Sequence, residues 1–183
     1  SINVQVLLFS LIKSMAVIAV AAYLLGLEFN ILPKLINQQA EKKTKLFLII
    51  FFGLLSILGT YLGIYIQEAY ANIRAIGAVV AGILGGPIVG GLAGLIGGGH
   101  RFFLGGFTAI PCAISTIIAG LIGGLVYYFR PLSKITTEEG FLLGVGIEIL
   151  EMGLVLVLSK PYPKAYELVK VISLPMILSN AAG

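Results

Sequence analysis

The sequence predicts an all-α polytopic membrane protein, and three observations lead to that fold class. Of the 183 residues, 58% are hydrophobic and only 11% are charged, whereas a soluble domain carries about 25% charged residues. The mean hydropathy is +1.06. The apolar residues are gathered into long runs, several of which approach the roughly 20 residues that a helix needs to cross a bilayer core. Such a chain has too few charges to cover a surface that faces water.

Six hydrophobic segments are expected, at residues 4–25, 46–66, 73–99, 108–129, 141–158 and 169–183. The first contains Lys13, is about as long as a full span and lacks an A-x-A-like end, so a cleavable signal peptide is not expected. Polar connections are expected at 28–45, 130–140 and 160–170. The last segment is short and the chain opens on Ser1, which favours a longer natural chain. Residues 1–183 are interpreted as a single transmembrane domain.

The third segment carries glycine at every fourth position, and a second row of small residues follows in the fourth segment. The two rows are Gly82, Gly86, Gly90, Gly94 and Gly98, and then Thr116, Gly120 and Gly124. On a helix this spacing forms one stripe, and rows of small residues let helices in lipid approach closely. Close helix packing is therefore predicted.

The same segment contains Gly85-Gly86-Pro87, where a helix is expected to break because proline lacks the backbone donor and clashes with the preceding turn. A continuous helix would hold Arg74 and Arg101 ~40 Å apart, whereas a re-entrant segment would bring both to one side. Cytoplasmic loops usually carry more lysine and arginine than external loops. The distribution of these residues among the predicted loops is compatible with six spans and both termini outside, or with five spans and only the N-terminus outside. The sequence leaves both arrangements open.

The candidate binding residues cluster around the start of the fourth segment: His100, Arg101, Thr108, Cys112 and Ser115. Pro111 suits a first helical turn, whose free N–H groups and positive dipole end attract anions. An arginine fork suits a carboxylate. The alternatives are an interfacial anchor for Arg101, a small packing residue at Cys112, a hydroxyl bonded back to its own helix at Ser115, and a polar cap at His100.

Two acidic residues, Glu148 and Glu151, share one face of the fifth segment. They are expected to be protonated, to pair with an arginine, or to line a polar path. We predict no catalytic residue, metal site or cofactor, because serine and cysteine lack a His/Asp pair and the glycines lie within an apolar helix rather than after a strand. No clustered basic face suggests nucleic-acid binding.

Five stretches resemble the sensory membrane domain of LytS/BtsS-type bacterial sensor histidine kinases, the 5TM-5TMR LYT family. They are Asn72-Ile73-Arg74-Ala75-Ile76-Gly77, Gly98-Gly99-His100-Arg101 and Gly105-Gly106-Phe107-Thr108-Ala109, with Gly85-Gly86-Pro87 between and Ser173-Leu174-Pro175-Met176-Ile177 near the end. The resemblance is specific from Asn72 to about Gly124 and looser in the first two spans. More distantly, the glycine-rich pattern is similar to the substrate-binding subunits of energy-coupling-factor vitamin transporters.

The resemblance implies a multi-pass receptor domain of the bacterial inner membrane that precedes cytoplasmic GAF-like and histidine-kinase portions. It implies a small carboxylate ligand such as pyruvate, a homodimer, and a response regulator as the partner of the kinase. The family's proposed ligand contacts fall on Arg74, Arg101, Cys112 and Ser115. Two alternatives stay open: a solute-binding subunit of a transporter, and a sensor of membrane potential or lipid state without a soluble ligand.

Overall fold

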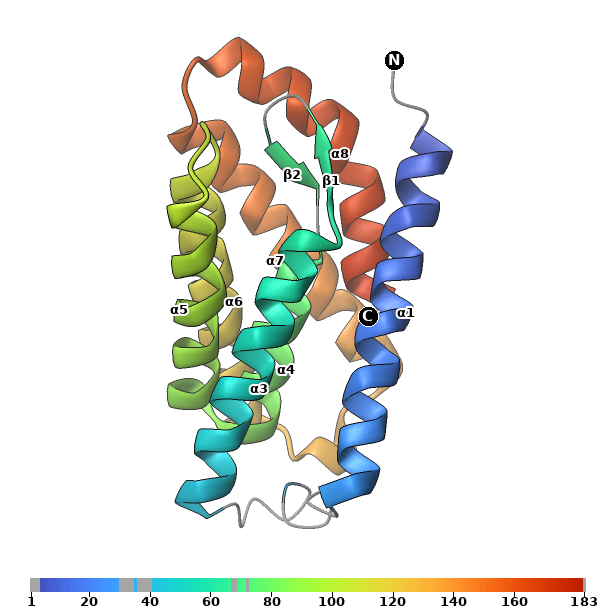
Figure 1. Cartoon of the computed structure of the whole chain (residues 1–183), viewed down its shortest axis with the longest axis vertical. Helices are drawn as coiled ribbons and strands as arrows, with labels where there is room; N and C mark the ends of the chain where they lie inside the picture. The colour runs from blue at the N-terminus through green and yellow to red at the C-terminus, as the bar shows by residue number, and fades with distance from the viewer. Residues whose placement is uncertain (1–3, 30–34, 36–40, 67–68, 72, 183) are drawn as a thin grey trace.

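The computed structural model describes residues 4–29, 35, 41–66, 69–71 and 73–182, and these are helical apart from one short hairpin and the connecting turns. In chain order the elements are α1 (Val4–Phe29), α3 (Lys42–Tyr61), β1 (Ile64–Ile66), β2 (Ala69–Ala71), α4 (Arg74–Gly85), α5 (Pro87–Phe103), α6 (Ala109–Phe129), the 3-10 turn η1 (Leu132–Lys134), α7 (Thr137–Leu158) and α8 (Tyr162–Ala182). In Figure 1, α5 and α6 form one side of the bundle and α1 the other. The core is therefore built between long, roughly aligned helices.

Three of the described helices are long and apolar enough to cross a membrane: Lys42–Tyr61, Ala109–Phe129 and Thr137–Leu158. Shorter apolar stretches lie at Gln5–Val17 and Arg74–Gly85. The surface also carries large apolar side chains, among them Phe9, Ile88 and Phe129, each at least 70% exposed. An exposed apolar surface of this kind fits contact with lipid rather than water.

Three of the predicted segment bounds need correction. The second segment does not stay helical to residue 66, because α3 ends at Tyr61 and the β-branched and aromatic residues after Gly63 pair as a hairpin, with Ile64 opposite Ala71. The helix of the fifth predicted segment, α7, begins at Thr137 rather than at residue 141. The Thr136 side chain and Glu139 form a capping box at this helix start. Of the predicted connection 28–45, residues 28–29 belong to α1 and residues 42–45 to α3, and most of the rest lies outside the described residues.

The helix of the sixth predicted segment, α8, begins at Tyr162 rather than near residue 169. The prolines of the 160–170 stretch suggested a loop, but a proline in the first turn of a helix loses no hydrogen bond. The result is a helix of 21 residues that packs against α7 and α1.

The glycine-rich third segment forms two helices, α4 and α5, which meet at Gly86. Gly86 has φ of +94°, a conformation that favours glycine, and Pro87 occupies the first position of α5. The chain folds back here, so that Gly82 and Gly90 come into close contact. The arms of this α4–α5 hairpin are ~18 and ~25 Å long from their 12 and 17 residues.

The hairpin packs against α6 through the glycine rows. A Cβ atom added at Gly82 or Gly90 would overlap the Gly120 carbonyl, and one at Gly124 would overlap the Pro87 backbone. At Gly98 the added atom would lie 2.6 Å from the Ala113 carbonyl oxygen. Backbone therefore touches backbone along this interface, which larger residues would force apart.

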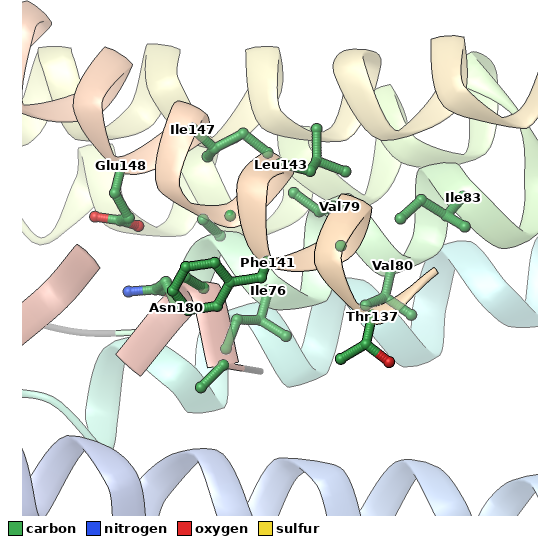
Figure 2. A pocket seen from close by; sticks show the side chains of 15 residues that line it. Ile76, Val79, Val80, Ile83, Thr137, Phe141, Leu143, Ile147, Glu148 and Asn180 are labelled. Carbon is green, nitrogen blue, oxygen red and sulfur yellow. The ribbon is translucent and has the colours of Figure 1, made fainter. Parts of the chain in front are cut away.

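A cavity of about 250 Å³ lies between α4, α7 and α8. Figure 2 shows its lining, with Ile76, Val79 and Val80 from α4, Phe141 and Ile147 from α7. It is mainly apolar.

Candidate functional site

The fold-back at Gly86 brings Arg74 and Arg101 to the same end of the α4–α5 hairpin. Arg74 is the first residue of α4 and Arg101 lies in the last turn of α5. Both side chains are 0% exposed. A buried guanidinium group must find hydrogen-bond partners or a counterion, because an isolated charge is costly away from water.

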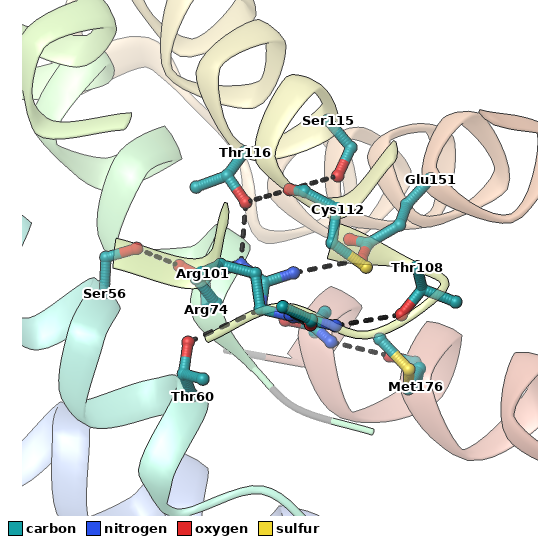
Figure 3. Close-up of polar contacts among 12 residues, drawn as sticks. Ser56, Thr60, Arg74, Arg101, Thr108, Cys112, Ser115, Thr116, Glu151 and Met176 are labelled. Atoms are coloured by element: carbon teal, nitrogen blue, oxygen red, sulfur yellow. Dashed lines mark hydrogen bonds and ion pairs between the residues drawn. The ribbon is translucent and has the colours of Figure 1, made fainter. Parts of the chain in front are cut away.

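Arg74 is held by side chains from three other helices. Its Nε donates to Thr116 Oγ1 at 2.8 Å, and its Nη1 donates to Thr60 Oγ1 at 3.4 Å. Its Nη2 donates to Glu151 Oε1 at 3.1 Å, an ion pair whose partners are 0% and 2% exposed. Ser56 Oγ also donates to the Arg74 carbonyl oxygen at 2.9 Å. Figure 3 shows these contacts, with Thr60, Thr116 and Glu151 around the guanidinium group and Ser56 at the backbone.

Arg101 is held by the loop that joins α5 to α6. Its Nη1 donates to the Gly105 carbonyl oxygen at 2.6 Å, and its Nη2 donates to Thr108 Oγ1 at 2.9 Å. Gly105 and Gly106 have φ of +72° and +92°, so the turn that wraps the loop around the guanidinium group uses conformations that favour glycine. The loop thus positions Arg101 beside the start of α6.

Cys112 lies in the first turns of α6 and is 4% exposed. Its thiol lies beside the Glu151 carboxylate (Figure 3). Both guanidinium groups are close enough to act on the thiol electrostatically. Cys112 therefore lies within electrostatic range of both arginines.

Ser115 is buried, but its hydroxyl donates to the Cys112 carbonyl oxygen of its own helix at 3.0 Å. Thr116 Oγ1 donates to the same carbonyl at 2.7 Å while accepting from Arg74. The structure thus gives Ser115 the intrahelical contact that was the alternative to ligand binding. To donate a hydrogen bond to a ligand, the Ser115 hydroxyl would have to rotate away from the Cys112 carbonyl oxygen.

His100 contacts Tyr61, a residue of α3. Its Nε2 lies 3.0 Å from the Tyr61 hydroxyl, and the two rings stack edge to face with centroids 5.2 Å apart. The imidazole links the end of α5 to the end of α3. Among the candidate residues, the structure gathers Arg74, Arg101, Thr108 and Cys112 and leaves His100 outside.

The sequence analysis missed Thr60 and Thr116 as partners of Arg74. Thr116 was assigned to a row of small packing residues, and its position four residues after Cys112 was the available signal. For Glu151, pairing with an arginine is the alternative that the structure realises. Glu148 differs, because neither carboxyl oxygen has a hydrogen-bond partner among the described residues.

Chemically, this arginine cluster (Arg74, Arg101, Thr108, Cys112, Thr116 and Glu151) offers hydrogen-bond donors suited to an anion. In the part of the chain that the structure describes, no group of three or more His, Cys, Asp or Glu side chains is arranged to hold a metal ion. Guanidinium forks bind carboxylates through paired N–H groups.

The membrane-length helices and the buried charged cluster define a multi-pass membrane domain. A family model described as "5TMR of 5TMR-LYT" matches residues 29–183. Sensor histidine kinase BtsS of Escherichia coli (strain K12) is 38% identical over 94% of this chain, and sensor protein LytS of Bacillus subtilis (strain 168) is 35% identical over 97%. LytS of Staphylococcus epidermidis is 30% identical over 94%. No solved structure matches the chain.

The chain therefore belongs to the 5TMR-LYT family, as a membrane sensor domain of the LytS/BtsS type. It is a multi-pass domain of the bacterial inner membrane. It covers 32% and 33% of the lengths of those BtsS and LytS relatives, so it spans about a third of them.

Proposed function

We propose that this chain is the ligand-receiving part of a two-component sensor histidine kinase and that it binds a small carboxylate such as pyruvate. The observation that carries the proposal is the position of Arg74 and Arg101, both fully buried, at one end of the α4–α5 hairpin and within electrostatic range of Cys112. Charged side chains buried in a membrane domain are costly, so two buried guanidinium groups are candidates for a functional role.

In this proposal α4 and α5 form a re-entrant hairpin, and the ligand carboxylate binds the guanidinium groups beside the first turn of α6. Thr108 holds Arg101 in position, and Ser115 and Cys112 line the site. Pyruvate has about six non-hydrogen atoms, and the best small ligands gain about −1.5 kcal/mol per atom. The resulting ceiling of ~9 kcal/mol lies just above the ~8.2 kcal/mol of micromolar binding, so micromolar affinity is feasible and nanomolar affinity is not.

Signal transmission follows from the Arg74–Glu151 ion pair. A ligand carboxylate that takes Arg74 Nη2 must displace or share Glu151, which belongs to α7. Helix α7 packs against α8, the last described helix. Ligand occupancy would therefore move α7 and α8, and this movement would be passed to the GAF-like and kinase portions that follow in the full protein. The full protein would act as a homodimer on a response regulator.

Calorimetric titration of the purified domain in lipid nanodiscs with pyruvate, and with lactate for comparison, tests the proposal. Arg101→Ala should abolish pyruvate binding because the fork is lost. Arg130→Ala is the matched control, since Arg130 is 51% exposed and pairs with Glu139 at the protein surface. Pyruvate affinity that survives Arg101→Ala in a folded protein would exclude this site.

A sensor of membrane potential or lipid state is a second candidate function, favoured by the two acidic side chains buried within the candidate span α7. Charges inside a span respond to the transmembrane field. In the full-length kinase, Glu148→Gln would then alter the response to a change in potential without pyruvate. An unchanged response would argue against this function.

A further inference from the structure

The cavity between α4, α7 and α8 is distinct in its chemistry from the arginine cluster. Its walls are apolar, and the lining residues with polar side chains are Thr137, Glu148 and Asn180 (Figure 2). Phe141, which is 42% exposed, forms part of the wall, so the cavity reaches the protein surface. An apolar pocket with a few polar groups is the usual form of a small-molecule site.

Glu148 is the unusual member of this lining. Its side chain is 0% exposed, and both carboxyl oxygens lack a hydrogen-bond partner among the described residues. The charged groups that act on it are Glu151, one turn further along α7, and Arg74. These two pair with each other at 3.1 Å, so Arg74 is already engaged. Buried polar groups without partners are rare in native proteins, and a bound ligand is one way to supply the partner.

We propose that this cavity binds a small apolar amine whose ammonium group pairs with Glu148. An ammonium–carboxylate contact would supply the missing partner, whereas the carboxylate of a pyruvate-like ligand would add a further acidic group beside Glu148 and Glu151. The apolar side chains of α4 and α7 would bury the body of the ligand. A volume of about 250 Å³ holds roughly eight non-hydrogen atoms at ~30 Å³ each, and a slightly longer ligand can extend through the opening at Phe141. The site does not depend on the carboxylate-binding function proposed above.

The first test is ligand-observed fluorine NMR on the domain in phosphatidylcholine nanodiscs, with empty discs as the background. The probe is para-fluorophenethylamine, and the matched neutral probe is para-fluorophenethyl alcohol. The amine should bind saturably and about tenfold tighter than the alcohol, since a charge-assisted contact is stronger than a neutral one. Glu148→Gln should lower the amine affinity by about tenfold and leave the alcohol affinity nearly unchanged. Equal binding of the two probes, or full amine affinity in Glu148→Gln, would overturn the proposal.

A second pair of variants tests the cavity without touching the carboxyl group. Gly140 lines the cavity and Gly146 does not, and a Cβ added at either position on α7 meets no atom within 4 Å. Gly140→Val should weaken the binding of both probes, whereas Gly146→Val should not. If both variants bind like the wild type, the probes do not occupy this cavity and the proposal fails.

The natural ligand of the cavity has two sources of an ammonium group, a free amine in solution or the head group of a lipid. Nanodiscs that contain phosphatidylethanolamine distinguish them. Competition by this lipid with the added amine would assign the cavity to a lipid head group. Unchanged amine affinity would assign it to a free amine.

Discussion

Replacing Glu151 by glutamine removes the carboxylate that accepts from Arg74 Nη2 at 3.1 Å while keeping the shape of the side chain. Both partners are buried, and breaking a buried pair typically destabilises a protein by about 3–5 kcal/mol. The glutamine amide retains an oxygen that can accept, so we expect a smaller loss of about 1–3 kcal/mol. The apparent unfolding midpoint of the domain should fall accordingly.

The affinity for pyruvate should rise in Glu151→Gln, although the stability of the domain falls. In the wild type the ligand carboxylate competes with Glu151 for Arg74, and in Glu151→Gln that competition is gone. A charge-assisted hydrogen bond is worth about 1.5–3 kcal/mol, so pyruvate should bind about tenfold to a hundredfold tighter. In the full-length kinase the same variant should lose its response to pyruvate, because α7 is no longer released from Arg74.

The assay is calorimetric titration of pyruvate into nanodisc-embedded wild type and Glu151→Gln. The matched control is Glu139→Gln, because Glu139 pairs with Arg130 at the surface and glutamine still completes the capping box with Thr136. This control should leave pyruvate affinity unchanged. Weaker or unaltered binding in a folded Glu151→Gln protein would refute the exchange of counterions and leave Glu151 a structural partner of Arg74.

Three further variants test the packing and the arginine contacts. Gly90→Ala should destabilise the domain by about 1–3 kcal/mol or prevent folding, because the added methyl group overlaps the backbone of α6, whereas Gly99→Ala has open space and should melt like the wild type. Thr116→Val leaves Arg74 Nε without its acceptor and should cost about 1–3 kcal/mol in chemical unfolding; a loss below about 0.5 kcal/mol would contradict the 2.8 Å contact. Arg101→Lys should weaken pyruvate binding in calorimetry because lysine lacks the planar fork, and unchanged affinity would argue against a bidentate contact.

Much of the fold was predictable from hydropathy and glycine spacing. The three candidate spans, α3, α6 and α7, lie in stretches that were predicted to be apolar, and shorter apolar helical stretches lie at Gln5–Val17 and Arg74–Gly85. Hydropathy does not separate an apolar helix from an apolar strand, so the β1–β2 hairpin after Gly63 was missed. The capping box at Thr136 was a readable signal for the earlier start of α7.

The candidate site was predicted in part. Arg101, Thr108 and Cys112 are near in sequence, so a loop and the next helix turn bring them together whatever the rest of the fold. His100 precedes Arg101 directly and therefore points to a different side of α5, toward Tyr61. The sequence indicates that His100 and Arg101 lie on different sides of a helix, but it did not predict that His100 contacts Tyr61.

The sequence by itself determined that this chain belongs in a membrane, that its helices pack closely through glycine, and that arginines are kept at both ends of an otherwise apolar segment. Only the tertiary structure decided what those charges contact. The Arg74–Glu151 pair spans 77 positions in the chain, and the cavity at Glu148 is formed by three helices. Local spacing fixes which face of a helix a side chain occupies, but its partner depends on how separate helices pack against one another.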